Sequence, residues 1–83
     1  MAEKKLLQLN IAKIDGPVFT GEVESVTVPG SEGEMTILAD HAPIVSALKA
    51  GLITVRASGM DNLEIAVTGG TMELSHNSLT ILL

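Results

Sequence analysis

The sequence contains no cysteine, which excludes a disulfide framework and any thiolate metal site. Basic residues are also scarce, with five Lys and Arg against ten Asp and Glu and a net charge of −5. A nucleic-acid partner requires a basic face, and base stacking requires aromatic side chains, of which Phe19 is the sole example. No apolar run approaches the roughly 20 residues that span a bilayer. We therefore expect neither nucleic-acid binding nor direct insertion into the bilayer.

Apolar residues are plentiful for a chain of this size. The 83 residues predict one domain, 1–83, and a domain this small buries only about 60% of the surface that its unfolded chain exposes. Hydrophobic residues make up 46%, charged residues only 18%, and the mean hydropathy is +0.41. Such a chain cannot hide all of its apolar side chains, so we expect an exposed apolar patch, which usually marks a contact surface for a partner.

Alternation of apolar and polar residues recurs along the chain and predicts β-strands, because successive side chains of a strand point to opposite faces. Turn signals arrive about every 8 to 12 residues, as in all-β sandwiches and barrels. The predicted inward-facing sets are Leu7, Leu9 and Ile11; Val26 and Val28; Met35 and Ile37; Leu63, Ile65 and Val67; Met72 and Leu74; and Leu79, Ile81 and Leu83.

Glycine and proline mark the predicted interruptions. We expect a bulge or close backbone approach at Gly21 and the end of a strand at Pro29-Gly30. The remaining predicted turns and breaks are Asp15-Gly16-Pro17, Ser58 to Asn62, Thr68-Gly69-Gly70, and Ser75 to Ser78.

The segment Ala42 to Ala50 is ambiguous. Pro43 fits the first turn of a helix that Gly51 would close, and a strand through Ile44 to Ser46 fits equally well. The pattern does not decide between them.

Polar residues gather at unusual density from Pro29 to Pro43, which raises the question of an active site. Asp40 and His41 are sequence neighbours, so on a strand they would point to opposite faces, and no nucleophile elbow is present. Glu32 and Glu34 have strand spacing that puts both carboxylates on one face. That pair could form an acid/base site, half of a calcium site or a solvated edge. The apolar excess of the chain and this acidic, glycine-rich segment together lead us to expect an acidic all-β module that binds other proteins.

Two further classes stay open on these residues alone. One is a small metal-binding or enzymatic module that uses Glu32, Glu34 and His41. The other is a generic protein-interaction domain.

Several of these motifs, taken together, resemble a known family. The segments Phe19 to Val23 and Val28 to Pro43, the latter with its G-x-x-G and H-A-P elements, are similar to the epsilon subunit of bacterial and chloroplast F-type ATP synthase. Ala47 to Gly51, Thr68 to Gly70 and Leu79 to Leu83 match further family segments without large gaps, so the resemblance spans nearly the whole chain. Asp40 stands where many family members carry glycine or another small residue.

The resemblance implies an all-β fold, a flattened β-sandwich of about ten short strands. It places Ala42 to Ala50 in a strand. Family members usually continue into a helical hairpin, whereas this chain stops at Leu83, so we expect no C-terminal helices. For the same reason we predict neither ATP binding nor restraint of ATP hydrolysis.

The resemblance also implies a role in the rotating central stalk, coupling the c-ring to the catalytic head. The expected partners are the gamma subunit, the c-ring and, indirectly, the alpha/beta head, on the cytoplasmic face of the bacterial inner membrane rather than the chloroplast thylakoid. The subunit would be non-catalytic, with no catalytic, cofactor or metal residues. The expected c-ring contact comprises Ser31, Glu32, Gly33, Glu34 and His41. The expected structural loop and turn residues are Gly21, Pro29, Gly30, Ala42, Pro43, Gly51, Gly69 and Gly70.

Overall fold

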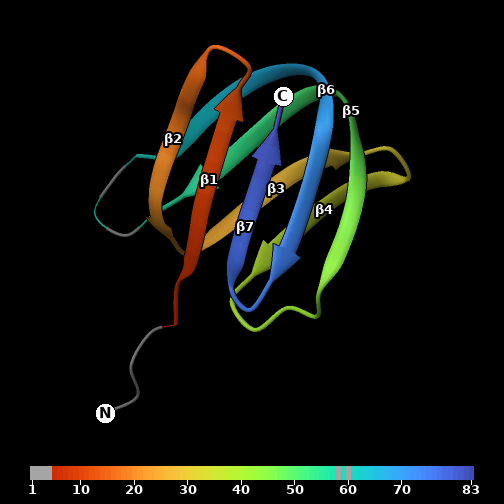
Figure 1. The fold of residues 1–83 in the computed structure, drawn as a ribbon. Helices are drawn as coiled ribbons and strands as arrows, with labels where there is room; N and C mark the ends of the chain where they lie inside the picture. The colour runs from red at the N-terminus through yellow and green to blue at the C-terminus, as the bar shows by residue number, and fades with distance from the viewer. Residues whose placement is uncertain (1–4, 58, 60) are drawn as a thin grey trace.

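The computed structural model describes residues 5–57, 59 and 61–83, and these fold into strands and turns without a helix. No helix able to cross a membrane therefore occurs in this part of the chain. The described residues form seven strands (Figure 1): β1 (Leu7–Lys13), β2 (Gly16–Val23), β3 (Ser25–Gly30), β4 (Gly33–Leu38), β5 (Ile44–Arg56), β6 (Leu63–Ser75) and β7 (Ser78–Leu82). The all-β prediction is confirmed.

All seven strands belong to one hydrogen-bonded sheet in the order β2-β1-β7-β6-β5-β3-β4. Neighbouring strands pair antiparallel, with the exception of β1 and β7, which pair parallel. The first and last strands therefore lie side by side in the middle of one layer, and Leu83 N–H donates to the Ala12 carbonyl at 2.9 Å. The two ends of the described domain are held by the same ladder.

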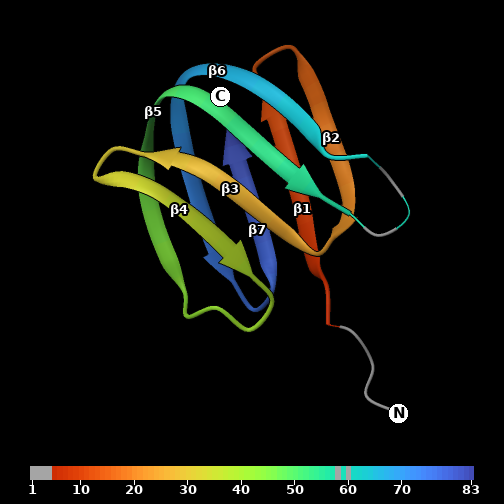
Figure 2. The same ribbon diagram turned by 180° about the vertical axis from the view of Figure 1, so that it is seen from behind.

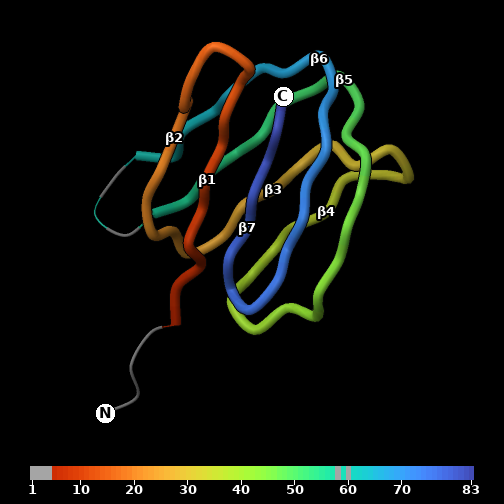
Figure 3. The backbone as a smooth tube through the Cα atoms, viewed as in Figure 1, coloured from red at the N-terminus to blue at the C-terminus, as the bar shows by residue number. Residues whose placement is uncertain are grey.

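The single sheet becomes a sandwich because β5 and β6, each 13 residues long, bend and run through both layers. The 180° views and the tube trace show both strands curving over the top of the molecule (Figures 2 and 3). Their pairing runs from Ile44↔Leu74 to Val55↔Leu63 and skips only Ala50 and Thr68, at the bend. This geometry closes a two-layer core without cutting the hydrogen-bonded ladder.

The bend contradicts three of the predictions made from the sequence. The chain does not break at Thr68-Gly69-Gly70, because β6 continues through these residues; Gly69 and Gly70 have φ values of 154° and 147° and curve the strand. Gly51 does not end an element as a turn residue would, since Ile44–Arg56 is one strand. The strand count is accordingly seven rather than about ten, because two long strands serve both layers.

Gly21 forms neither the predicted bulge nor a close backbone approach, since an added Cβ there would meet the Phe19 ring at an ordinary 3.5 Å. It pairs in register with Leu9, and the irregularity lies further along the same hairpin, between Ile11 and Ala12. The strand end at Gly30 is confirmed. The turn between β6 and β7 is also confirmed, with positive φ at His76 (50°) and Asn77 (60°), as a two-residue hairpin turn with right-handed strand twist requires. The predicted loop Ser58 to Asn62 includes residues 58 and 60, which lie outside the described residues.

The core lies between the two layers and consists of the alternating apolar residues. None of the polar side chains among the described residues is buried. The fully buried large side chains are Leu7, Leu9, Ile11, Val23, Val26, Val28, Ile37, Ile53, Met72, Leu74, Leu79 and Ile81. Period-two patterning therefore predicted most of the core correctly, whereas Leu63 is 38% exposed.

Candidate functional site

The first half of the polar segment forms the β3–β4 hairpin. Gly30 pairs with Gly33, and Ser31 and Glu32 make the turn between them. The hairpin is anchored to the rest of the sheet because Ser31 N–H donates to the Ala47 carbonyl at 2.9 Å. Its tip extends beyond the layer edge in both ribbon views (Figures 1 and 2). The sequence thus builds a protruding turn on a fixed base.

Close backbone packing holds the base of this hairpin. Pro29 is buried against Gly51 of β5, where an added Cβ would lie 2.9 Å from the Pro29 Cβ. An added Cβ on Gly30 would lie 2.7 Å from the Gly33 carbonyl oxygen and 2.8 Å from the Met35 Cε. A side chain at Gly51 would push the hairpin away from β5, and one at Gly30 would force β3 and β4 apart within the hairpin.

A groove of about 330 Å³ separates the hairpin from the start of β5. Glu32 and Glu34 are both exposed, but Glu32 lies in the turn and only Glu34 lies on β4. The two carboxylates therefore do not lie on one face of a strand, as their spacing in the sequence predicted. The groove is lined by Glu32, Gly33, Glu34, Met35, Ile44, Val45 and Ser46.

His41 lies in the β4–β5 loop, at the opposite end of β4 from the hairpin turn. Its backbone N–H donates to the Leu38 carbonyl at 3.3 Å. Its ring Nδ1 lies 2.7 Å from the Ala42 carbonyl oxygen, and because a carbonyl only accepts, Nδ1 carries the proton in this contact. Ala42 and Pro43 complete the loop before β5 begins at Ile44.

The structure therefore divides the residues that the sequence places in one segment. The five residue steps from Gly33 to Leu38, at roughly 3.3 Å each, put the two ends of β4 roughly 17 Å apart. Glu32 and Glu34 cannot share a metal ion or a substrate atom with His41 at that separation. Throughout the described ranges, no three His, Asp or Glu side chains come together as metal ligands.

The loop that carries His41 contains a polar cluster that the sequence did not reveal. Asp40 N–H donates to Asn77 Oδ1 at 2.6 Å, and Asn77 Nδ2–H donates back to Asp40 Oδ1 at 3.2 Å. Lys5 Nζ lies 2.8 Å from Asp40 Oδ2. The three residues are distant in sequence, so no local pattern could have identified them. The hydrogen bonds from Lys5 and Asn77 hold the pKa of Asp40 below its ordinary value, and Asp40 raises the pKa of Lys5.

These shifts predict a pH dependence of the cluster. Because the pKa of Asp40 is lower in the folded chain than in the unfolded chain, the stabilisation is present above the unfolded pKa. It disappears as the pH falls through the folded pKa, below about 3.8. We expect an NMR titration of the Asp40 carboxyl carbon to give a pKa below 3.8 and Lys5→Ala to move it upward. An ordinary pKa that Lys5→Ala leaves unchanged would contradict the ion pair.

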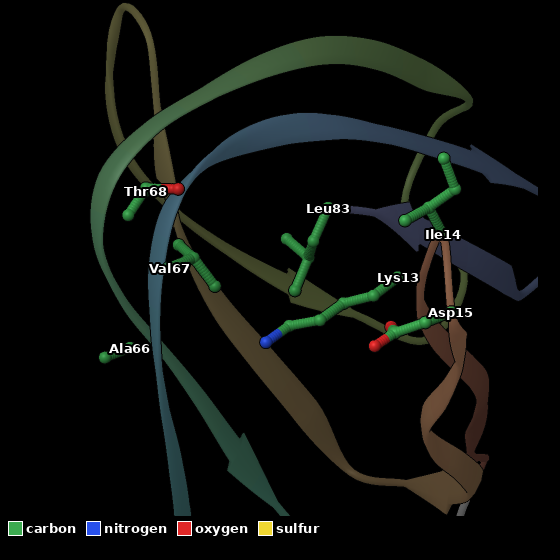
Figure 4. Close-up of a pocket in the computed structure, with 7 residues that line it drawn as sticks. All are labelled: Lys13, Ile14, Asp15, Ala66, Val67, Thr68 and Leu83. Carbon is green, nitrogen blue, oxygen red and sulfur yellow. The ribbon is translucent and has the colours of Figure 1, made fainter.

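A second pocket, of about 430 Å³, opens where the β1–β2 turn faces the first half of β6 (Figure 4). It is lined by Lys13, Ile14, Asp15, Ala66, Val67, Thr68 and Leu83. One amine and one carboxylate at its rim do not supply a nucleophile with an oriented base. Sequence reasoning did not anticipate this pocket, because its walls come from segments about 50 residues apart.

The exposed apolar side chains are distributed over the whole domain. Val45 (74% exposed) and Leu82 (56%) border one shallow depression on the outer face of β5, β6 and β7. Leu38 and Leu52 lie in the other layer, and Ile14 projects from the β1–β2 turn. The chain therefore exposes apolar surface, as its composition predicts, but spreads it over both faces.

The fold and the site together define a class: a small β-sandwich domain whose polar features are exposed turns and loops rather than an enclosed reaction centre. Comparison with known proteins identifies the particular family. Residues 6–83 match the family described as ATP synthase, Delta/Epsilon chain, beta-sandwich domain, and the chain belongs to this family.

Individual relatives are similar over most of this chain. The ATP synthase epsilon chain of Bacillus pumilus is 44% identical over 78 residues, 94% of this chain and 59% of the relative. That of Parvibaculum lavamentivorans is 42% identical over 82 residues, 99% of this chain and 61% of the relative. The chain thus spans about three fifths of the length of these relatives.

Solved structures share the fold. A chain in the Euglena gracilis mitochondrial ATP synthase, in a structure of OSCP/F1/c-ring, superposes with a TM-score of 0.87 at 24% identity, covering 93% of this chain and 49% of that one. A chain in the Tetrahymena thermophila mitochondrial ATP synthase central stalk/c-ring gives 0.78 at 16%, covering 98% of this chain and 65% of that one. At these identities the likeness supports the sandwich architecture.

Proposed function

We propose that this domain is part of the rotating central stalk of an F-type ATP synthase and couples rotation of the c-ring to the catalytic head. The observation that carries the proposal is the family match over residues 6–83, almost the whole chain. In this role the domain binds the gamma subunit and the c-ring and reaches the alpha/beta head indirectly. It performs no catalysis and lies peripherally on the cytoplasmic face of the bacterial inner membrane.

The sandwich suits the transmission of torque. Its strands form one continuous ladder, and β5 and β6 carry that ladder through both layers. A load applied to the β3–β4 hairpin passes through Ser31, Pro29 and Gly51 into β5. Close-packed interiors deform little under such a load. The two layers therefore move as one body.

We assign the c-ring contact to the hairpin tip, Ser31 to Glu34. The tip protrudes, its carboxylates are exposed, and its base is held by main-chain hydrogen bonds. His41 can belong to the same contact only if the ring covers the length of β4, roughly 17 Å. Exposed ion pairs contribute about 0–1 kcal/mol each, so several residues of the tip share the binding energy.

The test is co-purification of the tagged chain with gamma and with detergent-solubilised c-ring. We expect the unmodified chain to retain both. Glu32→Lys with Glu34→Lys should lower c-ring recovery several-fold, because attraction becomes repulsion, while gamma recovery stays unchanged. Glu64→Lys, an exposed glutamate on β6, is the matched control and should change neither.

Two outcomes would count against these assignments. Absence of a complex between the unmodified chain and gamma would contradict the stalk role. Full c-ring recovery by the doubly substituted chain would instead show that the hairpin tip is not part of the c-ring contact, without contradicting the stalk role.

A further inference from the structure

We propose that Asp40 and Asn77 form a clip that presets the shape of the β4–β5 loop, so that His41 is held ready for contact with a partner subunit. The inference rests on the proposed function, because it gives the loop a share in the stalk contacts. It adds a specific positioning role for two residues that lie in different turns, Asp40 in the β4–β5 loop and Asn77 in the β6–β7 turn.

The clip is a reciprocal hydrogen-bonded pair between segments 37 residues apart. Asn77 uses both ends of its amide: Oδ1 accepts from the Asp40 backbone at 2.6 Å, and Nδ2 donates to the Asp40 carboxylate at 3.2 Å. The second carboxylate oxygen of Asp40 contacts Lys5 Nζ at 2.8 Å. The loop is thereby attached to the β6–β7 turn and to the residues that lead into β1.

The backbone supports the same interpretation. Asp40 has φ 65° and Asn77 has φ 60°, both in the left-handed region. Apart from glycine, Asp and Asn enter this region most readily among common residues. Glycine would satisfy the backbone at either position but could not form the clip. The presence of Asp and Asn together therefore serves both the turn geometry and the side-chain pair.

The clip acts on His41 through its neighbours. Asp40 directly precedes His41, and the His41 main-chain bond to Leu38 is long, at 3.3 Å. The ring is oriented by the 2.7 Å contact between Nδ1 and the Ala42 carbonyl oxygen. A loop already ordered in the free domain loses less conformational entropy on binding, so the clip increases affinity without touching the partner.

The experiment compares two glycine substitutions in one turn. Asn77→Gly removes the clip and keeps a residue that tolerates positive φ. His76→Gly is the matched control, since His76 has φ 50° in the same turn and takes no part in the clip. We expect hydrogen exchange at the Asp40 amide to be at least tenfold faster in Asn77→Gly and unchanged in His76→Gly. Binding to the gamma–c-ring complex should weaken several-fold in Asn77→Gly alone.

A side-chain exchange provides the rescue. Asn77→Asp alone places two carboxylates together and should behave like Asn77→Gly. The double variant Asp40→Asn with Asn77→Asp restores one amide and one carboxylate and should recover both slow exchange and binding.

Equal exchange at the Asp40 amide in the two glycine variants would overturn the clip. Faster exchange in Asn77→Gly with unchanged binding would overturn its positioning role. The proposed function fails separately, if the unmodified chain does not bind gamma at all.

Discussion

Gly70→Ala is expected to lower the free energy of unfolding by about 2–5 kcal/mol, from a backbone cost of about 1–2 and an overpacking cost of about 1–3. Gly70 has φ 147°, which L-residues rarely adopt. An added Cβ would overlap the Leu82 carbonyl oxygen and lie 3.1 Å from Leu83 Cδ2. The obstacle is backbone of the paired strand, which cannot move aside without breaking the β6–β7 ladder. A domain of this size has about 4–12 kcal/mol of total stability, so much of it would be lost.

Chemical denaturation of Gly70→Ala and Gly16→Ala separates the two contributions. Gly16 has φ 146°, almost the value at Gly70, but an added Cβ there meets no atom within 4 Å. We expect Gly16→Ala to lose only the backbone cost, about 1–2 kcal/mol. Equal losses at the two positions would show that close packing at the bend contributes nothing.

Ile53→Ala is expected to cost about 2–5 kcal/mol, the range for deleting most of a buried aliphatic side chain and leaving a cavity. Ile53 is fully buried in the second half of β5 and is paired with Ile65 of β6. Because β5 takes part in both layers, the cavity would weaken the packing between them. Thermal and urea unfolding measure the loss.

Leu52→Ala is the control for this substitution. Leu52 is the preceding residue, on the opposite face of the same strand, and is 50% exposed. Its truncation removes less buried area and leaves no enclosed cavity, so we expect a loss of about 1 kcal/mol or less. A similar loss in both variants would contradict the assignment of the two faces of β5.

The location of the polar residues fits a domain that works through contacts. Glu32 and Glu34 are at the tip of a protruding hairpin, and His41 is on a loop at the far end of β4. Asp40 forms an ion pair with Lys5 and a hydrogen bond with Asn77. No described polar side chain is buried within the sandwich. The groups that we propose for recognition therefore lie on the turns, outside the apolar interior.

Alternation along single strands was enough to predict the all-β class and most of the core. Leu7, Leu9 and Ile11 fall on one face because side chains alternate in any strand, whatever it pairs with. The β6–β7 turn followed from its own residues in the same way. These features depend on neighbours in the sequence, which the sequence shows directly.

The sequence predicts a break at Gly69 and Gly70, where the structure has a bend, because this feature does not depend on sequence neighbours alone. Glycine signals a departure from flat strand geometry, but whether the chain ends its strand or curves depends on the pairing with β5 and β7. The same dependence explains the strand count and the ambiguity of Ala42 to Ala50, which pattern alone left undecided and the family resemblance resolved.

For the site, residue type and local order indicated a polar segment from Pro29 to Pro43 and left open whether Glu32, Glu34 and His41 act together. The packed structure divides that segment into a hairpin tip and a distant loop, and it brings Asp40 to Asn77 and Lys5. Strand pairing converts sequence neighbours into opposite ends of β4 and distant residues into hydrogen-bonded partners. The alternation of apolar and polar residues depends only on neighbours in the sequence, whereas the contacts between distant residues form only when the whole sheet is assembled.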